Sequence, residues 1–133
     1  MKKIMNHLLL FACFAMIMML TQCNTKTATF EDTIKDYYSS INKNNYKGTN
    51  PEMIAGWAAK TDNDRQYFEE FQGQIADIFK QHQGLKEVKI VSTIPGSTEA
   101  EVTLDVELIC NDGYTEAVSH QMVKEGEAWK VAQ

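Results

Sequence analysis

Glu116 and His120 are the two side chains whose types and spacing best suit chemistry at a binding site. They lie four residues apart in the segment Tyr114–Val123, where apolar and polar residues alternate as in a β-strand. Residues four apart on a strand point to the same face, so the carboxylate and the imidazole would share one surface. Together they could hold a polar group of a ligand or exchange a proton with it. An isolated histidine is more often a packed structural residue, and it is then expected to be neutral.

The loop at Asn111–Gly113 decides whether that shared face is the dry one. A three-residue loop with Gly113 as its left-handed residue would oppose Tyr114 to Cys110 and turn Glu116 and His120 inward. A two-residue loop would turn the alternate set inward, namely Thr115, Ser119 and Gln121. The hydrophobic pattern favours the three-residue loop, because it places Val118 and Met122 beside Val106 and Val102.

Trp57 and Tyr67 are the other candidates for lining a ligand site. Each lies in a segment with helical spacing of apolar residues, and this spacing favours packing in the core for both. The alternative is that their rings line the mouth of a ligand pocket.

Other chemistry has little support in the sequence. His82 and His120 are 38 positions apart without a neighbouring Cys or His, so neither a metal site nor a cofactor is expected. Cys110 falls in phase with the apolar face of a strand, where a free cysteine behaves as a small hydrophobic residue. Four acids alternate along one strand and are interpreted as a solvated face, with a cation site as the alternative: Glu99, Glu101, Asp105 and Glu107.

The first 22 residues are predicted to be a signal peptide. Two lysines precede the apolar run Leu8–Leu20, whose thirteen residues suit a secretory signal and are too few for a membrane span. The run ends at Leu20-Thr21-Gln22-Cys23, which resembles the lipobox of bacterial lipoproteins, although Gln22 replaces the usual small residue. A competing match ends at Cys13, but cleavage there would leave an apolar tail. We therefore expect Cys23 to carry the lipid anchor and residues 23–28 to form a short tether.

Location follows from this assignment. The residues after Cys23 lack the aspartate associated with retention in the inner membrane of enteric bacteria, and they lack the acidic run associated with surface export in Bacteroidetes. By that resemblance the protein would face the periplasm from the outer membrane. The whole chain has a net charge of −5, and loss of Lys2 and Lys3 with the signal makes it −7. This acidic balance argues against a nucleic-acid partner.

Residues 29–133 are predicted to form one α+β domain. Three helices come first: Phe30–Ile41 capped by Thr29, a short one after Asn50-Pro51 carrying Trp57, and a long one over about 62–82. After Gly84 the period of the apolar residues changes to two, which predicts four antiparallel strands with turns at Pro95–Ser97, Asn111–Gly113 and Lys124–Glu127. Trp129 and Val131 of the last strand are expected to close the core. The helices would cover one face of a curved sheet.

Several strings in this arrangement resemble a known family. They are Gly84–Ile90 after the long helix, Asp112-Gly113 before the third strand, and Val123–Val131 at the end of the chain. The chain resembles small bacterial lipoproteins of unknown function with a nuclear transport factor 2-like, cystatin-like cone domain, a group that some family profiles label lumazine-binding. The resemblance implies the cone fold and assigns no reaction. Relatives tend to be apolar at the position of His120.

A cone domain leaves a concave mouth, and such mouths are frequent sites for small molecules. We therefore expect a non-catalytic binding module with a pocket for a small, partly apolar ligand. The alternative is a scaffolding role, in which the sheet face contacts a second copy or an envelope protein. Isomerase or dehydratase chemistry is suggested by analogy with the fold alone.

Overall fold

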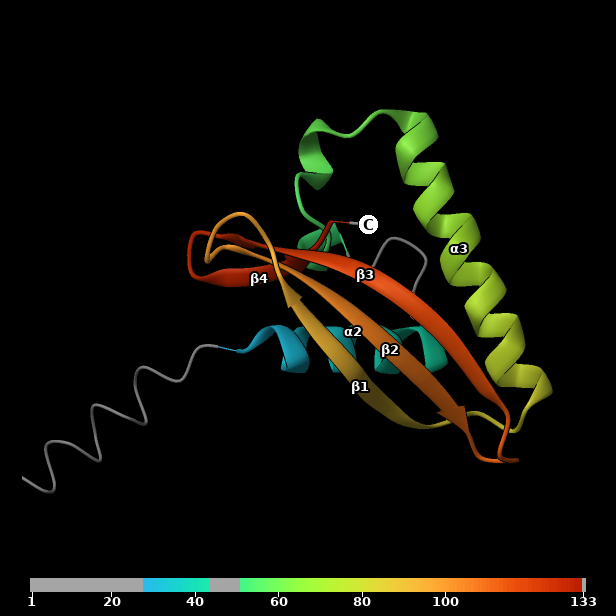
Figure 1. The fold of residues 1–133 in the computed structure, drawn as a ribbon. Coiled ribbons are helices and arrows are strands. Elements are labelled where there is room, and N and C mark those ends of the chain that lie inside the picture. The colour runs from blue at the N-terminus through green and yellow to red at the C-terminus, as the bar shows by residue number, and fades with distance from the viewer. Residues whose placement is uncertain (1–27, 44–50, 133) are drawn as a thin grey trace, which may run out of the picture.

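The computed structural model describes residues 28–43 and 51–132. The described chain contains two α-helices, two short 3₁₀ turns and one four-stranded antiparallel sheet in the order β1-β2-β3-β4 (Figure 1). The elements are α2 (Phe30–Asn42), η1 (Pro51–Met53), η2 (Trp57–Ala59), α3 (Asp62–Gln81), β1 (Leu85–Pro95), β2 (Glu101–Cys110), β3 (Thr115–Glu125) and β4 (Ala128–Val131). The predicted α+β class and the sheet are confirmed.

Helix α2 begins as the sequence predicts. The Thr29 hydroxyl accepts a hydrogen bond from the Asp32 backbone N–H, and the Asp32 carboxylate accepts one from the Thr29 N–H. This reciprocal capping box satisfies two backbone donors that the first turn would otherwise leave unpaired. The inward face of the helix carries fully buried side chains: Ile34, Tyr37, Tyr38 and Ile41.

The predicted second α-helix is wrong. Its place is taken by the turns η1 and η2, and between them Ile54 forms a parallel β-bridge with Val131. The Ala55 N–H donates to the Val131 carbonyl at 2.8 Å, so the backbone here hydrogen-bonds to β4 and not within a helix. Gly56 then adopts a left-handed conformation with φ of 61°, which ends any helical continuation.

Helix α3 begins at the predicted position and ends one residue before His82. The Thr61 hydroxyl accepts from the Asp64 N–H at the start, and the Gly84 N–H donates to the Phe79 carbonyl at the end. Gln83 and Gly84 both have positive φ, which turns the chain sharply into β1. Phe68, Gln72, Ile75 and Phe79 are buried. Tyr67 is 66% exposed, so its predicted core role is wrong.

The hairpin between β2 and β3 has the predicted three-residue loop. Cys110 and Tyr114 are joined by a 2.8 Å backbone hydrogen bond, and Gly113 has φ of 92°. The register opposes Val106 to Val118, Val102 to Met122 and Leu104 to His120. The dry face of β3 is therefore the one that carries Glu116 and His120.

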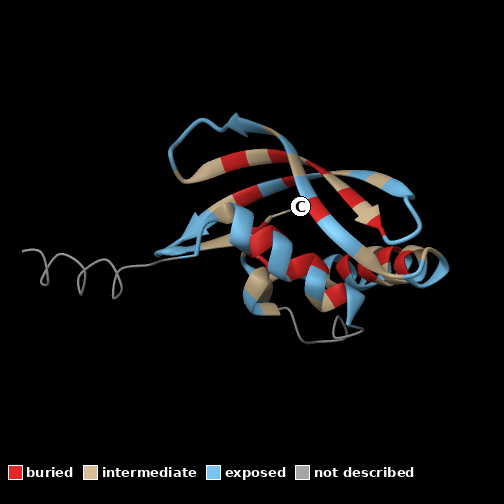
Figure 2. Ribbon diagram, turned by 90° about the horizontal axis from the view of Figure 1, so that it is seen from below, coloured by how far each residue is buried: buried red, intermediate tan, exposed pale blue. Residues whose placement is uncertain are grey.

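The core lies between the concave face of the sheet and the two helices, where buried residues are concentrated (Figure 2). Val131 is fully buried in this core. Trp129 is only partly buried and packs edge-on against Phe30, with the ring centroids 5.3 Å apart. It therefore closes the margin of the core, where β4 meets the start of α2, rather than its centre.

The predicted signal peptide and the lipid anchor at Cys23 lie outside the described residues. In residues 28–43 and 51–132, no helix is both long and apolar enough to cross a membrane.

Candidate functional site

A cavity of about 450 Å³ lies between α3 and the C-terminal half of β3. Figure 1 shows the two elements close together at the end of α3 and separating toward its beginning. The cavity is lined by residues of both helices, of the middle of β3, of the segment before α3 and of the segment after β4: Tyr37, Lys60, Asp64, Tyr67, Phe68, Phe71, Ser119, His120 and Ala132. Aromatic rings therefore form much of its wall, and its polar side chains include Lys60, Asp64, Ser119 and His120.

His120 is the buried polar side chain of this cavity. It is 3% exposed, because its register opposite Leu104 directs it into the space between the sheet and the helices. The Tyr38 hydroxyl and Nε2 of His120 form a buried hydrogen bond. Burial raises the pKa of Tyr38 well above its ordinary value, with the neighbouring Tyr37 adding to the shift, so Tyr38 stays protonated. The neutral Tyr38 hydroxyl can donate to Nε2 when His120 is the tautomer that carries its proton on Nδ1.

Tyr37 supplies a second polar group beside the first. Its hydroxyl accepts a hydrogen bond of 3.1 Å from Nε2 of Gln72, a buried residue of α3. Burial raises the pKa of Tyr37 to about 12, and the bond from Gln72 opposes that shift. Both tyrosines are therefore neutral hydrogen-bonding groups at neutral pH.

Rings surround the imidazole of His120 on several sides. Its centroid lies 5.9 Å from those of Tyr37 and Phe71 and 5.5 Å from that of Tyr38. These edge-on and tilted contacts fix the orientation of the ring, because the edge of one aromatic group lies against the face of the next. The arrangement is therefore preorganised.

Of the four predicted ligand-contacting residues, the structure brings two to the cavity. His120 and Tyr67 line it, whereas Glu116 and Trp57 do not. Glu116 shares the inward face of β3 with His120, as expected. Four residues of strand separate them by about 13 Å, so Glu116 lies at the hairpin end of the sheet.

Trp57 is held outside the cavity lining by Arg65. The guanidinium carbon lies 5.4 Å from the centre of the indole ring, and Nη2 donates to the Trp57 carbonyl at 3.0 Å. The indole also packs edge-on against Phe68. Trp57 therefore supports the wall of the cavity from behind.

Lys60 and Asp64 are lining residues that the sequence analysis did not single out. Nζ of Lys60 lies 5.2 Å from the centre of the Phe68 ring, and the Asp64 carboxylate accepts a 2.9 Å hydrogen bond from the Thr61 hydroxyl. In the sequence, Lys60 and Asp64 look like the charged residues that are common at the start of a helix. Only the fold shows that they border a cavity.

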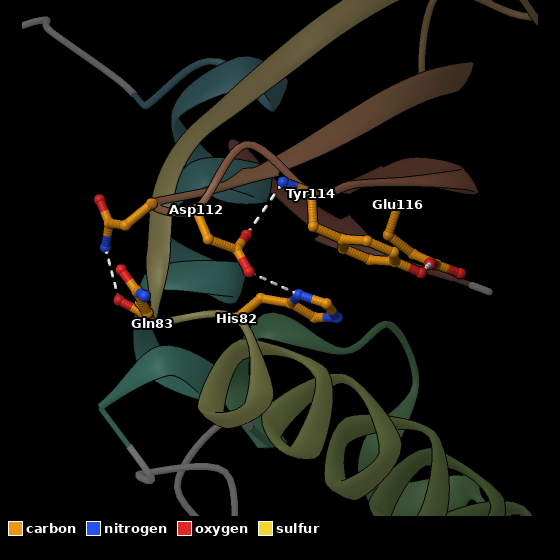
Figure 3. A network of polar contacts seen from close by, with 6 residues as sticks. His82, Gln83, Asp112, Tyr114 and Glu116 are labelled. Carbon is orange, nitrogen blue, oxygen red and sulfur yellow. Dashed lines mark hydrogen bonds and ion pairs between the residues drawn. The ribbon is translucent and has the colours of Figure 1, made fainter.

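A second polar cluster ties α3 to the β2–β3 hairpin, and we call it the His82 clasp (Figure 3). It consists of His82, Asp112, Tyr114 and Glu116. Nδ1 of His82 donates to the Asp112 carboxylate at 2.8 Å, and the Tyr114 hydroxyl donates to Glu116 at 2.6 Å. The rings of His82 and Tyr114 stack with centroids 3.9 Å apart. The clasp therefore holds the C-terminal end of α3 against the start of β3.

The remaining candidate groups do not form sites in the described part of the chain. Its residues contain no group of three or more His, Cys, Asp or Glu that could hold a metal ion. Ser92 donates to Asp105 and Ser97 donates to Glu101, so two of the four strand acids have hydroxyl partners on the outer face. Cys110 is a free, buried thiol whose pKa is raised by burial.

No protein-family model matches the sequence, and no curated protein matches it. A similar fold occurs in the crystal structure of a Campylobacter jejuni protein described as a "Putative NTF2-like transpeptidase", NTF2 being nuclear transport factor 2. The likeness has a TM-score of 0.62 and 17% sequence identity, and it covers 80% of this chain and 99% of the other. The lipoprotein and lumazine-binding parts of the resemblance remain predictions. What the likeness establishes is the fold, which is nuclear transport factor 2-like.

Proposed function

We propose that the protein is a non-catalytic ligand-binding module of the bacterial cell envelope, anchored by lipid on Cys23. The cavity between α3 and β3 would hold a small, partly apolar ligand. The exposed ring of Tyr67 and the half-buried ring of Phe71 offer apolar contacts, and Lys60 and Asp64 offer charges of both signs. Ligand pockets commonly combine apolar walls with a few fixed polar groups in this way.

The observation that carries the proposal is His120, a buried polar residue that lines this cavity and is hydrogen-bonded to Tyr38 in the core behind it. Burying an imidazole and a phenol in a core is unfavourable unless both are hydrogen-bonded, and apolar residues could fill the same space without that requirement. The pair is oriented by surrounding rings and lies beside open volume. Such fixed polar groups give orientation and specificity to a bound ligand.

The name of the Campylobacter protein raises group transfer as an alternative. In this chain Nε2 of His120 is already occupied by the Tyr38 hydroxyl, so that nitrogen is not directed at a substrate. A general base needs its nitrogen within hydrogen-bond reach of the proton that it removes. The contact with Tyr38 therefore favours binding over catalysis.

Native mass spectrometry of the full-length protein, purified in mild detergent from its own envelope, tests the pocket. We expect a retained small molecule in the wild type, and its loss in Tyr67→Ala and His120→Ala. Tyr67→Ala leaves the core intact because that side chain is 66% exposed. Glu116→Ala is the matched control, since it lies on the same face of β3 outside the cavity, and it should retain the ligand. An empty wild-type protein, or conversion of the ligand during incubation, would contradict the proposal.

The anchor has its own test. Mass spectrometry should find acyl chains on Cys23, and a Cys23→Ala protein should leave the membrane fraction. Two or more acyl chains give stable attachment at about 0.8 kcal/mol per buried methylene. Protease treatment of intact cells should leave the domain uncut if it faces the periplasm. Removal of the domain by that treatment would overturn the orientation.

A further inference from the structure

Half of β3 has no strand beside it on the side away from β2, as far as the described residues show. Strand β4 pairs only with Met122–Glu125, and one further bond joins the Ala132 N–H to the Gln121 carbonyl. From Thr115 to Ser119, no backbone hydrogen bond reaches β3 from that side within residues 28–43 and 51–132. This stretch, about 14 Å long, is the open edge of β3.

The ladder fixes which backbone groups face the open edge. Backbone bonds join Cys110 to Tyr114 and Ala100 to Lys124, and the register between them has no bulge. In an antiparallel pair, hydrogen-bonded residues alternate with residues whose N–H and C=O point away from the partner. The even-numbered residues of β3 therefore bond to β2. Thr115, Ala117 and Ser119 point their N–H and C=O groups outward, and all three are exposed.

The other edge of the sheet, formed by β1, has features that prevent pairing with a further strand. Strand β1 carries bulges at Leu85/Glu87 and Ile90/Ser92, two lysines, and Pro95 at its end. Bulges, lysines and prolines are the features by which proteins block unwanted strand pairing at an edge. The open edge of β3 has none of these features. The side chains that it carries on the outer face of the sheet are small and uncharged: Thr115, Ala117 and Ser119.

The open edge runs into the cavity. Ser119 is both its last residue and a lining residue of the cavity, and Tyr67, Phe68 and Phe71 of α3 line the same cavity. A ligand at this position would therefore meet backbone donors and acceptors on one side and aromatic rings on the other. An extended peptide satisfies both sides, because its backbone pairs with a strand edge while alternate side chains enter pockets.

We propose that the cavity and the open edge together bind an extended peptide segment, which adds a strand to β3 along Thr115–Ser119 and places one apolar side chain between Tyr67 and Phe71. This inference deepens the proposed function, since it uses the same cavity and names the ligand class.

Amide hydrogen exchange measured by NMR on the full-length protein in detergent micelles tests the pairing directly. The probes are acetylated pentapeptide amides of sequence Thr-Val-X-Val-Thr with X as Phe, Leu, Lys or Glu. With X as Phe or Leu, we expect slower exchange at the outward amides of the open edge, which are those of Thr115, Ala117 and Ser119, with the clearest effect at Ala117 and Ser119 nearest the cavity. Glu116, Val118 and His120 already bond to β2 and should change little.

Proline substitution removes the outward donors without touching the β2–β3 ladder, since an outward N–H at an edge is where a strand tolerates proline. Ala117→Pro and Ser119→Pro should each weaken binding of the Phe peptide roughly tenfold, the effect of one lost backbone hydrogen bond. Glu99→Ala, at an exposed position in the turn before β2, lies outside the open edge and the cavity and is the control, with a dissociation constant within about twofold of the wild type. Circular dichroism identifies any variant that fails to fold.

Several outcomes would overturn the peptide assignment. If a small molecule occupies the cavity and displaces no peptide, and the amides of Ala117 and Ser119 are unaffected by every probe, the proposed function survives and this inference fails. If those amides become protected with rising protein concentration alone, the open edge pairs with a second copy. Equal binding of all four probes would show that the aromatic wall does not select the side chain. An empty cavity with no binding of any kind would remove both proposals.

Discussion

The imidazole of His82 lies flat on the ring of Tyr114, with the centroids 3.9 Å apart and the ring planes within 7° of parallel. The two residues come from different elements, the C-terminal end of α3 and the start of β3. The end of α3 and the start of β3 lie close together here (Figure 1). The stacked contact therefore fixes the end at which α3 and β3 converge, and the cavity lies further along, where the two elements have separated (Figure 1).

The His82 clasp should make stability depend on pH through Asp112. The Tyr114 backbone N–H and then the His82 side chain lower the pKa of Asp112 below its ordinary 3.8. A lowered carboxyl pKa stabilises the fold above the unfolded-state value, and that stabilisation is lost as the pH falls through the folded-state value. Urea unfolding should show Asp112→Asn less stable than the wild type at pH 7, with the difference shrinking below pH 3.8. A difference that is constant with pH would contradict the ionic role of the clasp.

Tyr38→Phe should destabilise the protein by about 1–3 kcal/mol, because it removes the donor to Nε2 of His120 inside the core. Urea denaturation measures this loss. In the wild type, ¹⁵N chemical shifts of the imidazole should show Nε2 as an acceptor and Nδ1 as the protonated nitrogen. Tyr67→Phe, at an exposed position, should change stability by no more than about 0.5 kcal/mol. Protonation of Nε2 in the wild type would mean that the hydrogen bond runs in the opposite direction.

Trp129→Ala should cost about 2–3 kcal/mol, below the 3–5 kcal/mol of a fully buried tryptophan, because the indole is only partly covered. Its edge-on contact with Phe30 should couple the two residues. A double-mutant cycle with Phe30→Ala, followed by thermal unfolding, should give a coupling energy of about 0.5–1.5 kcal/mol. Strict additivity would show that the start of α2 is not packed on β4 in solution.

Gly113→Ala should lower stability by about 1–2 kcal/mol, since the residue has φ of 92°. A Cβ at this position would meet no atom within 4 Å, so the cost would be conformational and not steric. Gly113→Asn should be better tolerated, because asparagine enters left-handed conformations more readily. Thermal melts of the two variants provide the comparison, and an equal loss in both would point to another cause.

The local pattern of the chain was sufficient for most of the fold. The Thr29 cap, the change of period after Gly84 and the three-residue loop at Asn111–Gly113 are each specified by residues next to one another, and all three predictions are confirmed. The inward direction of His120 followed from this loop, because a strand's side-chain period is two and a one-residue change of register inverts every face.

Other features depended on contacts between residues distant in sequence. The segment before α3 has helix signals at Asn50-Pro51, yet the pairing of Ile54 with Val131 outweighs them. Glu116 and His120 share a face as the sequence predicts, but α3 diverges along β3, so only His120 borders the cavity and Glu116 belongs to the clasp. The Tyr38–His120 bond joins residues 82 positions apart. The sequence by itself determines the helices, strands and hairpin loop, because local hydrogen bonding and periodicity specify them. The docking of two helices on a curved sheet decides which side chains share a cavity.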